Sequence, residues 1–233
     1  MKTLRKALDI LEYAVLRGGG SVTPGEAAEA TGVNPATATR ILRALTERGY
    51  LVQVSRKRGY APGPMVTSIG TRRNQFSSLA AASEAPLKEL SARLGRQVNI
   101  SVLDGSSRVM LRFCAPDPGF VCWDHFFFRD HWDTATGRLL IAALDDPEAR
   151  SVCADCGIRP YPAKEIARIR KDGFVRFVQE DLTVIGHWIR VPGLPAAAIG
   201  FGVPHKRADE AFRLSGAAAG TICRTLQRNM KAF

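Results

Sequence analysis

Two cysteines separated by two residues, Cys153 and Cys156, have the spacing of half a zinc site or of a dithiol redox pair. A structural zinc site needs four ligands, and the sequence has neither a second Cys-x-x-Cys nor a His-x-x-x-His. Cys122, His125 and His131 offer further donor atoms, but at no known metal-binding spacing. We therefore predict no metal site and interpret both cysteines as partly buried thiols in a loop after a helix.

A cluster of polar residues that could do chemistry lies between positions 124 and 133. It consists of Asp124, His125, Arg129, Asp130, His131 and Asp133. Acid–base catalysis or metal binding could use such residues, but no Ser or Cys nucleophile on a sharp turn accompanies them. The glycines at 18–20 and 200–202 also lack the context of a phosphate-binding loop. The group is typical of a polar strand edge and loop, so we expect no enzymatic activity and no cofactor.

Positive charge is denser in the first part of the chain. The protein has 233 residues with 33 Lys and Arg against 22 Asp and Glu, a net charge of +11. Residues 1–63 hold 10 basic and 5 acidic residues, a net +5, and the other 170 residues hold 23 and 17, a net +6. Such an excess attracts polyanions, and nucleic acid is the first candidate.

The composition excludes several other classes of protein. Hydrophobic residues at 45% and charged residues at 24% are typical of a folded globular chain. Five cysteines in a chain of this length indicate reduced thiols, and charged residues such as Arg5 and Asp9 interrupt any leader-like apolar run. The longest uncharged stretch, 191–203, is too short to cross a bilayer. We expect a cytoplasmic protein without a membrane partner.

Helix signals organise the first fifty residues. Apolar residues at helical spacing predict a helix over 3–16. Thr23-Pro24-Gly25-Glu26 is a capping box for a short helix over 24–30 that stops at Gly32. Asn34-Pro35 then starts a longer helix over 35–48. The apolar side chains expected to face inward on this helix are Ala38, Ile41, Leu42 and Leu45.

A basic hairpin follows the third helix. A strand over 50–54, a turn over 55–59 and a return strand at 60–61 complete the order of a winged helix-turn-helix. In that fold the third helix enters the major groove and the wing contacts the DNA backbone. We predict that four residues lie near base edges: Thr37, Thr39, Arg40 and Arg43. Three more are predicted near phosphates: Arg56, Lys57 and Arg58. The alternative, a merely solvated basic hairpin, does not account for the agreement of caps, apolar stripe and turn.

The rest of the chain predicts a second domain of mixed strands and helices. Residues 64–82 read as a helical linker, followed by a second helix that ends at Gly95. Asp104-Gly105 is a hairpin turn, and a closing helix is predicted over 207–230. The predicted strands are 97–103, 108–113, 121–128, 174–178, 187–191 and 196–203, with helices over 133–143 and before Gly173. The fold class is α+β with two domains, 1–63 and 83–233, the second with an antiparallel sheet.

The first domain resembles the DNA-binding domain of IclR-type bacterial transcription regulators. The resemblance rests on Arg40-Ile-Leu-x-x-Leu-x-x-x-Gly49-Tyr50, together with Ala30-Thr-Gly-Val33. The second domain resembles the GAF-like effector-binding domain of that family at five places: Leu103-Asp-Gly105, Thr134-Ala-Thr-Gly-Arg138, Ile169 to Phe174, Gly186, and Ala196 to Pro204. The resemblance implies a regulator that binds a double-stranded DNA operator as a homodimer or homotetramer and responds to a small-molecule effector.

The resemblance also implies an effector site. Its residues would be Ala135, Thr136, Glu180 or Asp181, Ile189, Gly200 and Gly202. Many relatives carry Cys where Ile189 stands and Ser where Gly200 and Gly202 stand, so fewer groups here can hydrogen-bond a ligand. We therefore expect any pocket to be larger and less polar. Four aromatics could line it, namely Trp123, Phe126, Phe128 and Trp132, but for these side chains we favour plain core packing over ligand contact.

Two other functions stay open from the sequence. The second domain could serve assembly alone, without an effector. The chain could also be a metal-binding protein or a small-molecule enzyme that retains a winged helix as an appendage.

Overall fold

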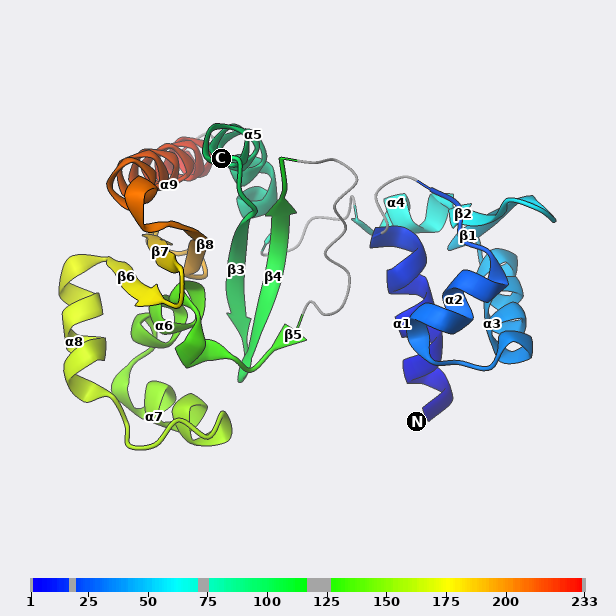
Figure 1. Cartoon of the computed structure of the whole chain (residues 1–233), viewed down its shortest axis with the longest axis horizontal. Helices are drawn as coiled ribbons and strands as arrows, with labels where there is room; N and C mark the ends of the chain where they lie inside the picture. Colours follow the sequence, from blue (N-terminus) through cyan, green and yellow to red (C-terminus); the bar gives the residue numbers. More distant parts are fainter. Residues whose placement is uncertain (1, 17–19, 71–75, 117–126, 232–233) are drawn as a thin grey trace. The chain divides into compact units, whose positions relative to one another are not determined.

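The computed structural model describes residues 2–16, 20–70, 76–116 and 127–231 (Figure 1). The described residues up to Gly70 form one compact unit, and those from Phe76 onward form a second. Each unit has its own hydrophobic core. The predicted strand-like run at 121–126 and two of the three glycines at 18–20 lie outside the described residues.

The first unit is a winged helix-turn-helix. Its elements in chain order are α1 (Lys2–Leu16), α2 (Pro24–Thr31), α3 (Pro35–Glu47), β1 (Leu51–Ser55), β2 (Gly59–Pro62) and α4 (Pro64–Gly70). The two strands pair antiparallel, and Val22, ahead of α2, bridges to Tyr60 on β2. The core joins α1, α2 and α3 to the sheet through apolar side chains that include Ile10, Leu42 and Leu51.

The predicted helix starts are confirmed. At α2 the Thr23 side chain accepts a hydrogen bond from the Glu26 amide at 3.3 Å, and the Glu26 carboxylate accepts from the Thr23 amide at 2.8 Å. At α3 the Asn34 side chain accepts from the Ala36 amide at 2.9 Å. Each bond satisfies a backbone donor that the first turn of a helix leaves unpaired. These caps fix where α3 begins and hence which of its residues face outward.

The second unit is a six-stranded antiparallel sheet between two layers of helices (Figure 1). The strand order is β5-β4-β3-β8-β7-β6. The strands are β3 (Val98–Asp104), β4 (Ser107–Cys114), β5 (Phe127–Phe128), β6 (Phe174–Gln179), β7 (Leu182–Ile189) and β8 (Ala197–Pro204). The helices are α5 (Ser77–Leu94), α6 (Ala135–Ala143), α7 (Asp146–Asp155), α8 (Ala163–Asp172) and α9 (Ala208–Lys231), with short 3-10 turns at His131–Asp133 and His205–Arg207.

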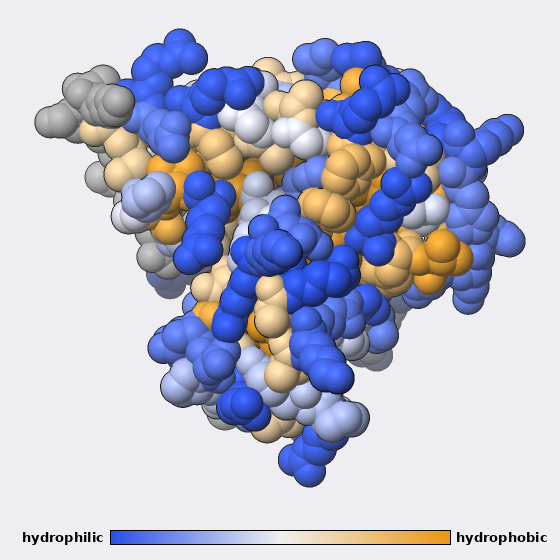
Figure 2. Space-filling model, turned by 90° about the vertical axis from the view of Figure 1, so that its left-hand side faces the viewer, coloured by the Kyte–Doolittle hydropathy of each residue, from blue (hydrophilic) through white to orange (hydrophobic). Residues whose placement is uncertain are grey.

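The two faces of the sheet bury different side chains. One face packs against α5 and α9 through residues such as Ile100, Ile185 and Ile199. The opposite face packs against α6, which is backed by α7 and α8. On the outer face of the molecule shown in Figure 2, apolar side chains are visible in separate patches between hydrophilic ones. None of the described helices is both long and apolar enough to cross a membrane.

The structure corrects three of the predicted elements. β7 begins at Leu182, not at 187, because β6 and β7 are joined by a tight Glu180-Asp181 turn that lacks the usual Gly or Asn. α5 begins at Ser77, within the predicted 64–82 linker, and continues through Pro86, since its buried leucines offset the hydrogen bond that proline removes. Cys153 lies on α7 and not in a loop, and Cys156 follows directly at the end of that helix.

Candidate nucleic-acid interface and candidate effector site

The outer face of α3 presents two unpaired cations. Arg40 and Arg43 are both exposed, while Ala38, Ile41 and Leu42 on the other side of the helix are buried. Within the described part of the chain, no carboxylate lies within ion-pair distance of either guanidinium. Their donors are therefore available to the acceptors of a base edge or a phosphate.

Thr37 and Thr39 occupy the margins of this face. Both are half-buried, and the Thr39 hydroxyl donates to the Pro35 carbonyl at 2.9 Å, which leaves only its acceptor positions free. Two small residues, Ala36 and Ala44, lie exposed beside the arginines. The sequence prediction did not single them out, although small side chains on an outward stripe allow a helix to approach DNA closely.

The wing carries its three cations at an exposed tip. Arg56, Lys57 and Arg58 are all exposed, and the Arg58 amide donates to the Ser55 hydroxyl at 2.9 Å across the turn. Gly59 follows with a φ of 82°, and a side chain there would overlap the backbone of Val22. The hairpin is thus tied to the body of the unit at its base, and its charged tip extends into solvent.

At the effector positions, α6 lies directly on the sheet. Ala135 and Thr136 are buried at the start of α6, opposite Gly186 on β7 and Gly200 on β8. A Cβ added to Gly200 would lie 2.5 Å from the Thr136 methyl carbon, and one added to Gly186 would lie 2.7 Å from the Ala135 methyl. The space left by these glycines is filled by the helix, which corrects the expectation of a larger, less polar pocket there.

The remaining effector candidates are not brought to this place. Glu180 and Asp181 form the exposed β6–β7 turn. Ile189 is buried on the opposite face of the sheet, in the core under α5 and α9. Gly202 lies beside Leu182, near the far end of β7. The structure therefore groups Ala135, Thr136 and Gly200 and separates the other four.

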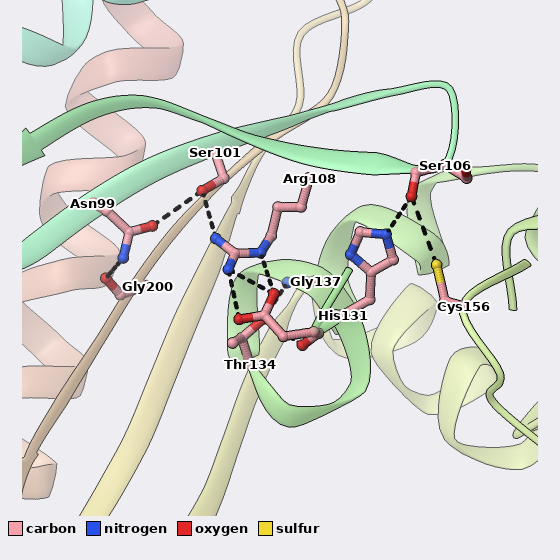
Figure 3. A network of polar contacts seen from close by, with 10 residues as sticks. Asn99, Ser101, Ser106, Arg108, His131, Thr134, Gly137, Cys156 and Gly200 are labelled. Atoms are coloured by element: carbon pink, nitrogen blue, oxygen red, sulfur yellow. Dashed lines mark hydrogen bonds and ion pairs between the residues drawn. The ribbon is translucent and has the colours of Figure 1, made fainter. Parts of the chain in front are cut away.

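A buried polar network adjoins that group (Figure 3). The Arg108 guanidinium, on β4, donates to the Asp130 carboxylate from Nη2 at 2.7 and 3.0 Å and from Nε at 3.3 Å. Its Nη1 donates to the Ser101 hydroxyl at 3.2 Å, Ser101 donates to Asn99, and Asn99 donates to the Gly200 carbonyl. The sequence analysis did not single out Arg108 as a functional residue. Its position in a half-buried strand, where side chains alternate between core and solvent, could have indicated a buried charge that needs a partner.

Comparison with known proteins shows which regulators the chain is similar to. Residues 3–55 match the model of the IclR helix-turn-helix domain. HTH-type transcriptional regulator Rv1719 of Mycobacterium tuberculosis is 25% identical over 236 residues, which cover 89% of this chain and 84% of that protein. The transcriptional repressor IclR of Escherichia coli is 29% identical over 106 residues, 46% of this chain and 38% of the repressor. Residues 3–55 are thus an IclR-type helix-turn-helix domain, and the chain is similar along most of its length to a transcription regulator.

Solved structures of IclR-type proteins share the fold of this chain. An IclR homologue from Microbacterium hydrocarbonoxydans, in complex with 4-hydroxybenzoate, superposes with a TM-score of 0.68 at 16% identity and covers 97% of this chain and 99% of its own. Thermotoga maritima IclR superposes with a TM-score of 0.62 at 21% identity, with the same coverage. The predicted fold class, a winged helix-turn-helix followed by an α/β domain with an antiparallel sheet, is confirmed.

His131, Cys153 and Cys156 in the second unit have structural surroundings. His131 is buried, which lowers its pKa, and its Nε2 lies 3.0 Å from the Ser106 carbonyl. The Cys156 thiol donates to the same carbonyl at 3.6 Å, and burial raises the pKa of both Cys153 and Cys156. The described residues contain no group of three or more His, Cys, Asp or Glu side chains suited to a metal ion.

Some of the candidate residues lie outside the described part of the chain. They are Cys122, Trp123, Asp124, His125 and Phe126.

Phe128 and Trp132, the two described aromatics for which core packing was favoured over a pocket, pack against arginines. Phe128 lies with its ring centre 4.4 Å from the Arg108 guanidinium carbon. Trp132 lies 5.4 Å from that of Arg138, which also lies over Phe177 and pairs with Glu165. Trp132 is therefore part of the packing around α6, and Phe128 covers the Arg108 guanidinium on β4.

Proposed function

We propose that this regulator binds a double-stranded operator as a homodimer or homotetramer, with α3 in the major groove and the β1–β2 wing on the DNA backbone. The observation that carries the proposal is the pair of exposed guanidiniums of Arg40 and Arg43, which have no carboxylate partner among the described residues, on a helix whose start is fixed by the Asn34 cap. Arginine is the side chain that most often reads a guanine edge in the major groove. The wing residues Arg56, Lys57 and Arg58 add contacts that do not depend on sequence.

An oligomer follows from the size of the interface. One recognition helix and one wing reach only a few base pairs, whereas specific operator binding buries a larger surface and reads two half-sites. A dimer supplies the second half-site and its spacing. This role assigns the protein to the cytoplasm, where the operator is, and gives it no catalytic step.

Arg40→Ala tests the assignment of α3. Operator fragments would first be selected from genomic DNA, and the affinity of each variant would be measured on the operator and on bulk DNA. We expect roughly 10-fold to 100-fold weaker operator binding, about 1–3 kcal/mol for the removal of one base-specific interaction, with a much smaller effect on bulk DNA. Arg228→Ala, which removes an exposed cation from α9 in the second unit, is the charge-matched control. An equal loss of affinity for operator and for bulk DNA would show that Arg40 does not contribute to sequence-specific binding.

We further propose that the second unit responds to a small molecule at the face of the sheet under α6. The described residues that would take part are Ala135, Thr136 and Gly200, which lie together and beside the Arg108 network. Because α6 fills the space at Gly200, a ligand would have to displace the start of α6 to contact them. Support comes from the shared fold, since the Microbacterium hydrocarbonoxydans homologue was solved with 4-hydroxybenzoate. A ligand would control operator binding only by favouring one arrangement of the oligomer over another.

A further inference from the structure

Two cysteines lie one helical turn apart on α7. Cys153 is in the last turn of the helix, and Cys156 is its C-cap residue. The Cys156 amide still donates to the Val152 carbonyl at 3.0 Å, so the helical hydrogen-bond pattern continues through Cys156. In an α-helix the α-carbons of residues i and i+3 lie about 5 Å apart. A disulfide needs α-carbons about 4.4–6.8 Å apart, so the backbone of α7 can accept one without unwinding.

The two side chains also point into the same core. Cys153 is buried in the cluster that joins α6, α7 and α8, and the partly exposed Cys156 packs against that cluster. Burial raises the pKa of Cys153, and the neighbouring Cys156 raises it further, a Coulombic effect that weakens with distance. The β-carbons at i and i+3 lie about 5–6 Å apart and those of a disulfide about 3.5–4.5 Å apart. A small movement at the end of the helix would therefore join the two sulfur atoms.

Backbone hydrogen bonds hold the end of α7 without the thiols. The Ile158 amide donates to the Cys153 carbonyl at 2.8 Å, and the Gly157 amide donates to the Ala154 carbonyl at 3.1 Å. Gly157 has a φ of 72°, so the helix ends in a left-handed turn of the kind that commonly closes helices. Because these bonds use main-chain atoms, they can persist whether the cysteines are reduced or oxidised.

Two other described cysteines offer a comparison. Cys114 lies on β4 and Cys223 on α9, and both belong to the core on the opposite face of the sheet. Cys223 is partly exposed, like Cys156, but it is the only cysteine of its helix. A reagent that modifies any accessible thiol would therefore reach both Cys156 and Cys223, whereas only Cys156 has a second thiol one turn away.

We propose that Cys153 and Cys156 form a reversible oxidation site, at which a low-molecular-weight disulfide converts the two thiols into an intramolecular disulfide. The partly exposed Cys156 thiolate attacks one sulfur of the small disulfide R–S–S–R, forms a mixed disulfide and releases R–S⁻. The Cys153 thiolate then attacks the Cys156 sulfur and releases the second R–S⁻. Two cysteine thiols are oxidised, and one R–S–S–R is reduced to two R–SH, which take up the two protons that the cysteines lose.

Oxidation would remove one contact of the turn that joins β3 and β4. The Cys156 thiol donates to the Ser106 carbonyl in this turn at 3.6 Å, and the His131 Nε2 lies 3.0 Å from the same oxygen (Figure 3). A disulfide sulfur has no hydrogen to donate, so the Ser106 carbonyl would keep the histidine and lose the thiol. The oxidation state of α7 would thereby act on the β3–β4 turn.

The place of the pair on its helix makes the reaction slow at neutral pH. Reactive Cys-x-x-Cys thiols commonly lie at a helix N-terminus, where the dipole favours the thiolate, whereas Cys156 lies at a C-terminus. Burial also raises the pKa of Cys156. Since the attacking species is the thiolate, the rate of the first step should rise about ten-fold from pH 7 to pH 8.

The test uses the full chain and glutathione disulfide as the oxidant. After incubation the remaining thiols are alkylated, and the intact protein and its peptides are analysed by mass spectrometry. We expect the unmodified protein to lose two hydrogen atoms, with the bond located between Cys153 and Cys156 and reversed by dithiothreitol. Cys153→Ala should stop at one glutathione bound to Cys156. Cys156→Ser, which keeps a hydrogen-bond donor for Ser106, should leave Cys153 unreacted.

Hydrogen exchange of a peptide that spans the β3–β4 turn supplies a second readout. Oxidation should speed exchange there in the unmodified protein and leave it unchanged in Cys156→Ser. Should Cys153→Ala not fold, Cys153→Ser keeps the side-chain volume and carries the same expectation.

Four results would overturn the proposal. They are no reaction of Cys156 at pH 8, a mixed disulfide that accumulates on Cys156 of the unmodified protein, a disulfide that joins either residue to another cysteine, and an exchange rate in the turn that oxidation does not change. None of them depends on operator binding, so a failure here leaves the proposed function untouched.

Discussion

At the scale of single residues, glycine decides how closely α6 approaches the sheet. Gly186 and Gly200 stand opposite each other on β7 and β8 and face α6. A missing side chain leaves room either for a ligand or for a neighbour's methyl group, and the residue type alone does not distinguish the two. Here the Thr136 methyl takes the room at Gly200. For this reason the sequence could indicate that Gly200 lacks the hydroxyl group of a serine. It could not indicate that the Thr136 methyl group fills the space that the missing side chain leaves.

This packing predicts that Gly200→Ala destabilises the second unit, by about 1–3 kcal/mol, because the new methyl would lie 2.5 Å from that of Thr136. Thr136→Ser removes the opposing methyl, so the double variant should recover most of the stability. Urea unfolding of all three proteins measures the coupling. Gly202→Ala is the control, because its nearest neighbour is the flexible end of Leu182 at 3.2 Å. Strictly additive effects of the two changes would contradict this packing.

At the scale of elements, the sequence predicted best where a local signal ends each segment. The capping box at Thr23, the Asn34 cap and the Asp104-Gly105 turn each fix a boundary through bonds between near neighbours, and all three are present. The start of β7 was wrong because its turn has no such signal. Glu180 and Asp181, which the resemblance assigned to the effector site, lie in this exposed turn. Pairing with distant strands, which placed Ile189 on the other face, cannot be read from local spacing.

The wing is an element whose predicted role depends on charge alone. Replacement of Arg56, Lys57 and Arg58 by alanine should weaken binding to operator and to bulk DNA by the same factor. The slope of log affinity against log salt becomes shallower by about 0.9 for every phosphate that is no longer neutralised, so the total change should not exceed about 3. Binding measured at several salt concentrations gives this slope. Arg56→Lys with Arg58→Lys keeps the charge and should leave the slope unchanged, and a triple variant with the original slope would contradict the role.

At the scale of the whole molecule, function is divided between two units that have separate cores. The core around Leu42 joins the helices of the winged unit to its small sheet, and the core around Leu139 joins α6 to the large sheet. The basic groups proposed to bind DNA all belong to the first unit, and the Arg108 network belongs entirely to the second. Composition and motifs were sufficient to predict two domains, since each carries its own complete apolar pattern.

Separate cores predict separate responses to core mutation. Leu42→Ala and Leu139→Ala each remove a fully buried side chain and should cost about 2–5 kcal/mol in the unit that contains it. Hydrogen exchange followed on peptides from α3 and from α6 reports the two units independently. We expect Leu42→Ala to speed exchange in α3 with little effect in α6, and Leu139→Ala to do the reverse. Leu8→Ala, at an exposed position on α1, serves as the control for truncation of a leucine. Equal acceleration of both peptides by either core variant would mean that the chain unfolds as one cooperative body and that its two units do not have independent stability.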